Sequence, residues 1–281
     1  MALNQTSFQM GLSIESISEH TCSLGEGLFC SDSGVANWVD IDRQEVFYSG
    51  GDRVVVFEST PSAIIAHRPE GLEVVTTDGL VLLSTESGKI IQARSWQGLQ
   101  HDIGSFRTND AVSFLSGTGG LVGFMHVDTP QTVPGFVYKF DAEGNCDLLC
   151  EDIFIPNGFV PLNVNEYLVC DSAVGQIRNL DIRTSQAPFE KNPIWTTVSD
   201  GAPDGGCRVG DLVFFAIWGG ACVKVFSKHG DSLGQLPLPV TYPTNIKKVA
   251  FKDEFYVTSA WEASEGQVKR ELDGKTLRVC Y

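Results

Sequence analysis

Four short polar motifs, far apart in the chain, carry the oxygen donors of a candidate metal site. Each precedes an apolar run that indicates a strand. The motifs are Leu-Gly-Glu-Gly at 24–27 with Glu26, Phe-Arg-Thr-Asn-Asp at 106–110 with Asn109, Ile-Pro-Asn-Gly at 155–158 with Asn157, and Ala-Pro-Asp-Gly at 202–205 with Asp204. Two carboxylates and two amides offer only hard oxygen ligands, which suit a divalent cation. A fold that gathers these side chains would therefore form a cation site.

An internal repeat indicates which fold could gather them. Each copy has an apolar run, a short loop, a second apolar run and a polar turn, and successive copies begin about 41 to 46 residues apart. The six copies lie at 37–49, 79–91, 120–141, 166–181, 211–226 and 254–270. This spacing is typical of four-stranded propeller blades. A lone blade cannot bury both faces of its sheet, so a ring of neighbouring blades is the closed solution.

We therefore predict an all-β protein: one six-bladed β-propeller domain over residues 1–281, with four-stranded antiparallel blades around a central channel. Residues 11–17 are expected to form a strand that completes the last blade and closes the ring. The loops before the innermost strands should meet at one channel mouth, which would bring the four polar side chains together. Taken singly, Pro-Asn-Gly and Pro-Asp-Gly are common turns. The hypothesis depends on their joint occurrence in the register of the repeat.

The motifs also resemble the SMP-30/gluconolactonase/luciferin-regenerating-enzyme family, which includes regucalcin. The resemblance covers nearly the whole chain in order. It rests on residues 24–27 with 38–41, on 107–110, on 157–158 with 171–172, on 203–205 with 218–220, and on 256–260. It implies a six-bladed propeller that hydrolyses a sugar lactone to the aldonic acid with one divalent metal ion, which could be Ca²⁺, Zn²⁺, Mg²⁺ or Mn²⁺.

The resemblance also implies roles for individual residues. Glu26, Asn157 and Asp204 would be the metal ligands, and Asp204 would also be the catalytic general base. The substrate contacts would be Arg107, Asn109 and Asp128. In this scheme the cation polarises the lactone carbonyl and activates the attacking water.

The pocket walls differ from the family pattern, and alternatives therefore stay open. The usual Pro and aromatic residue after the first motif are replaced by Leu-Phe-Cys at 28–30, and the stretch after Asn157-Gly158 is Phe-Val-Pro-Leu-Asn at 159–163. One alternative is a non-catalytic propeller that binds a divalent metal or small ligand. Another is a different ester hydrolase on the same scaffold. A protein-interaction propeller would be expected to repeat Gly-His and Trp-Asp dipeptides, which the sequence lacks.

Composition and charge exclude several other classes. The chain has 35 Asp and Glu against 20 Lys and Arg, a net charge of −15, which disfavours nucleic acid and anionic membranes as partners. No apolar stretch is long enough to span a bilayer, and the first residues lack the pattern of a secretory signal. The eight cysteines form no Cys-x-x-Cys pair, as expected for buried thiols in a reducing compartment. We expect a cytoplasmic monomer of carbohydrate metabolism.

Overall fold

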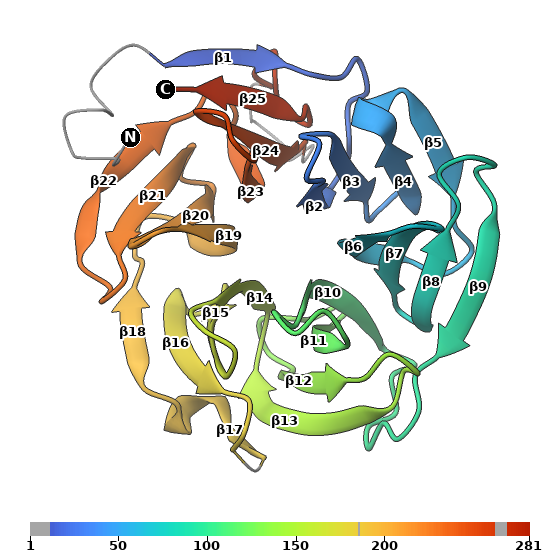
Figure 1. The fold of residues 1–281 in the computed structure, drawn as a ribbon. Coiled ribbons are helices and arrows are strands. Elements are labelled where there is room, and N and C mark those ends of the chain that lie inside the picture. The colour runs from blue at the N-terminus through green and yellow to red at the C-terminus, as the bar shows by residue number, and fades with distance from the viewer. Residues whose placement is uncertain (1–11, 185, 262–268) are drawn as a thin grey trace.

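The structure, a computed structural model, describes residues 12–184, 186–261 and 269–281. Its strands form six sheets arranged as blades around a central opening (Figure 1). The prediction of an all-β, six-bladed propeller is confirmed. Within the described ranges, helical structure is limited to two short 3₁₀ turns, η2 (Ser49–Gly51) and η3 (Phe189–Lys191).

Each blade contributes one innermost strand to the wall of the channel and a second strand behind it. The innermost strands are β2 (Gly25–Cys30), β6 (Pro61–Arg68), β10 (Phe106–Ser113), β14 (Pro156–Pro161), β19 (Ala202–Val209) and β23 (Tyr242–Lys248). The second strands are β3 (Ala36–Asp40), β7 (Gly71–Thr76), β11 (Gly120–His126), β15 (Glu166–Asp171), β20 (Leu212–Trp218) and β24 (Glu254–Ala260).

The third and outermost strands complete each blade in antiparallel order. The third strands are β4 (Glu45–Tyr48), β8 (Gly79–Leu83), β12 (Gly135–Phe140), β16 (Gln176–Asp181), β21 (Cys222–Ser227) and β25 (Leu277–Cys280). The outermost strands are β5 (Arg53–Val56), β9 (Ile90–Ser95), β13 (Cys146–Ile153), β18 (Ile194–Thr197), β22 (Ser232–Pro237) and β1 (Ser13–Ser16). The third blade gains a fifth strand, because β17 (Ala187–Pro188) pairs in parallel with β13.

The last blade joins the two ends of the described chain. Strand β1 pairs antiparallel with β25, with Ser13 opposite Cys280 and Ser16 opposite Leu277. Strand β25 in turn pairs with β24 of the same sheet. Because one sheet contains strands from both ends of the sequence, separating the first and last blades requires breaking this strand pairing.

Two copies of the predicted repeat were placed incorrectly. In the second blade the copy at 79–91 covers β8 and β9, so it begins one strand later than the copies in the other blades. In the last blade the second apolar run was expected at 267–270. Residues 267 and 268 lie outside the described ranges, residues 269 and 270 are not in a strand, and the third strand is β25 at Leu277–Cys280.

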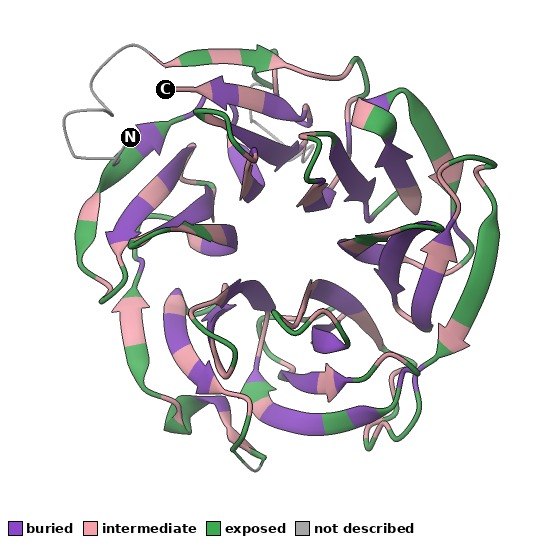
Figure 2. Ribbon diagram, in the orientation of Figure 1, coloured by how far each residue is buried: buried purple, intermediate pink, exposed green. Residues whose placement is uncertain are grey.

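The apolar core is divided among the interfaces between blades. Six buried clusters each combine residues from two neighbouring blades. In β12, for example, Phe136 and Tyr138 pack toward the second blade, whereas Val137 packs toward the fourth. This alternation follows from the two-residue period of a strand. The innermost and middle strands are therefore mostly buried, while the outer strands β5 and β9 are mostly exposed (Figure 2).

All six innermost strands bulge at an equivalent level. A bulge inserts an extra residue into one strand of a pair and changes the direction in which the neighbouring side chains point. The register shifts between Glu26 and Phe29, Pro61 and Ala63, Thr108 and Ala111, Asn157 and Val160, Pro203 and Gly206, and Pro243 and Asn245. The motifs identified in the sequence therefore lie at this ring of bulges.

Glycine allows neighbouring inner strands to approach closely at the bulges. Gly158 has a φ of +57°, and a Cβ atom there would lie 2.5 Å from the carbonyl oxygen of Asp204 in the next blade. Gly27 has a φ of +56° and would meet the Ser62 carbonyl oxygen of the next blade at the same distance. A side chain at either position would strain the backbone and push two blades apart.

Replacing Gly158 with alanine should therefore destabilise the protein through both effects. We expect Gly158→Ala to lower the free energy of unfolding by more than Gly210→Ala does, by an additional ~1–3 kcal/mol typical of overpacking. Gly210 is a matched control, because its φ is +61° but nothing lies within 4 Å of its Cβ position. Urea denaturation followed by circular dichroism measures both variants. Equal losses would contradict the interblade contact.

The structure leaves all eight cysteines as free thiols. Burial raises the pKa of the Cys207 thiol to about 11 and that of Cys170 well above its usual range, which keeps both protonated and unreactive near neutral pH. No helix in the described ranges is long and apolar enough to cross a bilayer.

Candidate functional site

Acidic side chains from blades that are not neighbours meet in the channel. Glu26 belongs to the first blade and Asp204 to the fifth, and their carboxyl groups lie close enough for each to shift the pKa of the other. Both side chains are buried, each with an exposed fraction of 5%. Because the sixth blade separates the two in the ring, their proximity places both groups in the channel rather than between adjacent sheets.

The same local hydrogen bond orients each of the three predicted metal ligands. In each case a side-chain oxygen accepts the backbone N–H of the glycine that follows. The distances are 2.9 Å from Gly27 N to Glu26 Oε2, 3.2 Å from Gly158 N to Asn157 Oδ1, and 3.0 Å from Gly205 N to Asp204 Oδ1. The side chains are therefore held in place by their own bulges, and each carboxylate keeps its second oxygen for another partner.

Two other acidic residues of the sequence motifs support the strands instead of joining the cluster. Asp40, at the end of β3, accepts the N–H groups of Ser23 and Leu24 at 2.7 and 3.1 Å, immediately before β2. Asp171, at the end of β15, does the same for residues 154 and 155 at 2.9 and 3.1 Å, before β14. These carboxylates hold the backbone in place immediately before the strands that carry Glu26 and Asn157.

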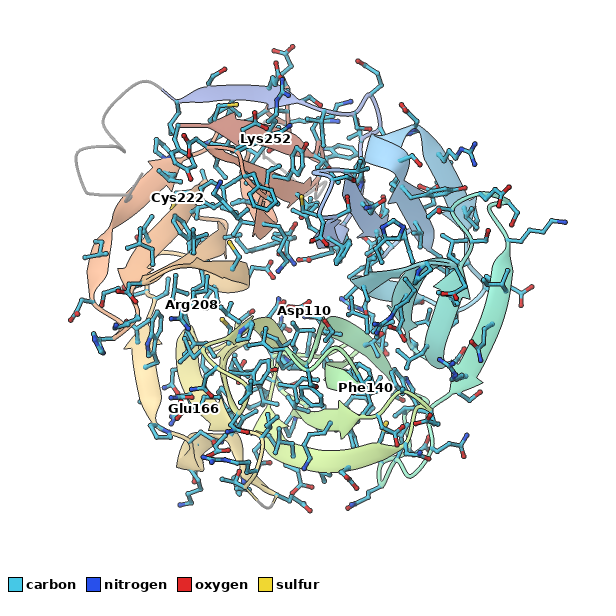
Figure 3. The ribbon with its side chains drawn as sticks, in the orientation of Figure 1. Asp110, Phe140, Glu166, Arg208, Cys222 and Lys252 are labelled. Atoms are coloured by element: carbon cyan, nitrogen blue, oxygen red, sulfur yellow. The ribbon has the colours of Figure 1, made fainter. Side chains whose placement is uncertain are left out.

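Asp110 is a third carboxylate of the channel that the sequence analysis missed. It lies beside the central opening (Figure 3), is buried, and accepts the N–H groups of Gly158 at 3.0 Å and Ala111 at 2.8 Å. The available signal was its place next to Asn109 inside the same motif. Without the bulge in β10, however, adjacent residues of a strand would point to opposite faces, and only one of them was assigned a role.

Burial and mutual repulsion raise the pKa values of these carboxyl groups. Burial is the largest cause for Glu26, whose pKa rises to about 7, and the charge of Asp110 adds to it. Burial also raises the pKa of Asp204 well above its usual range, followed by the charges of Glu26 and Asp110. The channel therefore concentrates acidic groups in a place where water cannot fully stabilise their ionised forms.

Arg107, just before the bulge in β10, and Asn109, within it, form a linked pair. Arg107 Nη1 donates to Asn109 Oδ1 and to the Thr108 carbonyl oxygen, each at 2.9 Å. Asn109 Nδ2 donates to the carbonyl oxygen of Pro156 at 3.0 Å. Burial lowers the pKa of Arg107, while negative charges that include Glu26 and Asp204 act in the opposite direction. The guanidinium thus lies within electrostatic reach of the carboxylate cluster.

Asp128 is the one predicted site residue that is exposed. It lies in the loop after β11, where its backbone N–H donates to His126 Nδ1 at 3.3 Å. Since His126 lies opposite Phe106 in the β10–β11 pair, this loop is at the same end of the blade as Arg107. A role for Asp128 in substrate binding stays a prediction.

The residues of the channel fit a hard divalent cation. The innermost strands carry several buried carboxyl groups, the buried amide of Asn157, and buried oxygens without a hydrogen-bond partner at Ser62 Oγ and Asn245 Oδ1. Such groups require compensation by a cation, protons or water. Across the described ranges, no three His, Cys, Asp or Glu side chains are arranged as ligands, so a cation would also need the amide oxygen of Asn157.

Comparison with known proteins identifies the family. The model of the SMP-30/gluconolactonase/LRE-like region matches residues 24–261, so the chain belongs to this family. A protein of Rhizobium meliloti (strain 1021) named "Putative sugar lactone lactonase" is 28% identical over 279 residues, which cover 94% of this chain and 92% of that protein.

Solved structures share the fold at low sequence identity. The calcium-binding protein regucalcin of Agrobacterium tumefaciens has a TM-score of 0.83 and 23% identity, over 95% of this chain and 93% of that one. A gluconolactonase of Xanthomonas campestris has a TM-score of 0.72 and 14% identity, over 99% and 93% of the two chains. These similarities agree with the propeller described above.

The raised pKa of Glu26 predicts a pH-dependent stability of the metal-free protein. The folded state holds this proton up to about pH 7, whereas the unfolded chain releases it near 4.5. Between these two pH values the folded state therefore binds more protons than the unfolded chain does. The free energy of unfolding that Glu26 contributes at low pH is consequently lost as the pH rises from about 4.5 to 7. In chelator-treated protein we expect Glu26→Gln to flatten this fall in the free energy of unfolding, measured by urea denaturation. An unchanged slope would contradict the assignment.

Proposed function

We propose that this chain is a divalent-metal-dependent sugar lactonase that opens a sugar lactone to the aldonic acid. The observation that carries the proposal is the proximity of Glu26 and Asp204 across the channel, within the segment that matches the family. The relative from Rhizobium meliloti, named as a sugar lactone lactonase and aligned over nearly the whole chain, supports the substrate class.

Glu26, Asn157 and Asp204 would hold the cation. When bound, a divalent cation supplies a Lewis acid that polarises a carbonyl and lowers the pKa of water. The two carboxylates offset the double positive charge of the cation. The amide is neutral, so it adds a ligand without further reducing the ability of the cation to polarise the substrate carbonyl. The hydrogen bonds from the following glycines fix the three side chains before the cation arrives.

Asp204 is proposed as the general base. Its buried carboxylate lies among other negative charges, which favours acceptance of a proton from the attacking water. A carboxylate has about four lone-pair sites, so Asp204 can accept the Gly205 N–H, hold the cation and still accept this proton.

Arg107 and Asn109 are proposed to hold the substrate. Two bonds from Arg107 Nη1 fix the guanidinium, and its remaining N–H groups can donate to ring or hydroxyl oxygens of a sugar lactone. Asn109, anchored on Pro156, orients the arginine. Holding the lactone in one orientation reduces the entropic cost of attack.

The direct experiment measures acid release from glucono-δ-lactone by chelator-treated protein, with Ca²⁺, Zn²⁺, Mg²⁺ or Mn²⁺ added back separately. We expect turnover only with an added cation. Asp204→Asn should lower kcat/KM by about 10²–10⁴-fold, as expected for loss of a general base, and should also weaken cation binding measured by calorimetry. Full turnover by Asp204→Asn would contradict the proposal.

Two further variants make the result specific. Asp211→Asn removes an exposed carboxylate that pairs with Lys228 at 3.1 Å, so its activity should match the wild type. Arg107→Ala should raise KM more than it lowers kcat, because the proposed contacts are to bound substrate. A protein that binds the cation but turns over no lactone would instead be the non-catalytic metal-binding propeller.

A further inference from the structure

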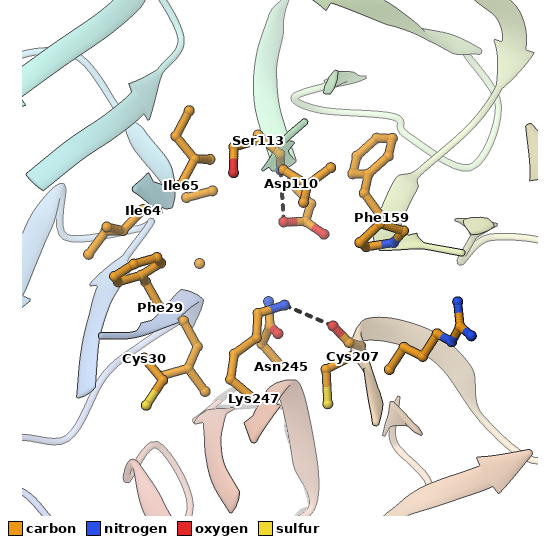
Figure 4. Close-up of a pocket in the computed structure, with 18 of the residues that line it drawn as sticks. Phe29, Cys30, Ile64, Ile65, Asp110, Ser113, Phe159, Cys207, Asn245 and Lys247 are labelled. Carbon is orange, nitrogen blue, oxygen red and sulfur yellow. Dashed lines mark hydrogen bonds between the residues drawn. The ribbon is translucent and has the colours of Figure 1, made fainter. Parts of the chain in front are cut away.

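A cavity opens from the channel beyond the ring of bulges. Along β10, Arg107 precedes the bulge, whereas the cavity is lined by residues 110–113 and by the corresponding later parts of other inner strands (Figure 4). Its volume is about 600 Å³. Its lining includes none of the residues proposed to bind metal or substrate. The cavity therefore lies outside the proposed metal and lactone contacts, although it shares Asp110 with the carboxylate cluster.

The charge of this cavity is opposite to that of the whole chain. Arg208, Lys247 and Lys248 line it together with a single acidic residue, Asp110, although the chain carries 35 acidic and 20 basic residues. A concave surface lined mainly by one sign of charge focuses the potential and attracts oppositely charged ligands. Its occupant is therefore expected to be an anion.

Lys247 is the basic group best placed to bind that anion. It is partly buried, and its ammonium donates to the carbonyl oxygen of Gly206 at 2.8 Å, across the interface with the fifth blade (Figure 4). Lys248 Nζ and Arg208 Nε also donate to backbone carbonyl oxygens, at 3.2 and 2.7 Å. A lysine ammonium has three donors, so Lys247 keeps two after this bond.

Most of the remaining wall is apolar. Ile64, Ile65 and Phe159 are buried, Phe29 is partly buried, and Leu115 is exposed. An apolar wall with a few fixed polar groups is the usual construction of a small-molecule site. A ligand that fits both features has an acidic group for the lysine and an apolar body for the wall.

We propose that this cavity binds a small organic acid with an apolar body, its carboxylate or sulfonate held by Lys247. The residues proposed to bind the metal and the lactone do not line this cavity, although Asp110 and Asn245 lie at the boundary between the two sites. Asn245 separates them. It lines the cavity, and its Nδ2 donates to Glu26 Oε2 at 3.4 Å.

The test uses 1-anilinonaphthalene-8-sulfonate, an apolar anion whose fluorescence reports binding. We expect saturable binding to the whole wild-type protein. Lys247→Met should weaken it by about tenfold or more, a loss of about 1.4 kcal/mol. Lys89→Met, at an exposed position, and Arg107→Ala, at the other end of the channel, should leave it unchanged. Weaker binding in Arg107→Ala but not in Lys247→Met would place the probe elsewhere and overturn the proposal.

A second pair of variants avoids disturbing the Lys247–Gly206 contact. Leu115 is exposed at the cavity, so Leu115→Glu should fold normally and repel the anion, whereas Leu115→Gln should bind it nearly as well as the wild type does. The uncharged probe N-phenyl-1-naphthylamine should not distinguish Lys247→Met from the wild type. No binding of the sulfonate, equal binding by both Leu115 variants, or a similar effect of Lys247→Met on both probes would overturn the proposal.

Discussion

The close approach of the six innermost strands at their bulges is the constraint on which the rest of the structure depends. At Gly158 the neighbouring strand lies so near that a Cβ atom would be 2.5 Å from a carbonyl oxygen. This approach lets acidic side chains of separate blades, Glu26 and Asp204, share one desolvated space. The six interblade cores and the pairing of β1 with β25 hold the strands at this distance.

The carboxylate cluster is unfavourable for folding when it is ionised and uncompensated, and this property links stability to function. Burial raises the pKa of Glu26 and Asp204 because their charged forms lose hydration. A divalent cation would replace the missing compensation and bind the folded state selectively, which would also stabilise it. The same arrangement that costs stability in the free protein would therefore supply affinity for a metal.

The sequence was sufficient to predict the architecture because a propeller repeats its strand pattern at regular intervals. It also singled out Glu26, Asn157 and Asp204, but it placed them in loops before the innermost strands, whereas they lie within those strands at the bulges. The second blade was misplaced because β7 and β8 are both short apolar runs. Strand β25 was missed because residues 261–276 separate it from β24, a longer connection than the one between the second and third strands of any other blade. Asp110 and Lys247 could not be placed, since their positions depend on bulge register and on contacts between blades.

Anomalous diffraction from crystals soaked in Mn²⁺ tests the central claim most directly. The account predicts one strong peak in the channel, within ligand distance of the side-chain oxygens of Glu26, Asn157 and Asp204. A channel without a peak would contradict it.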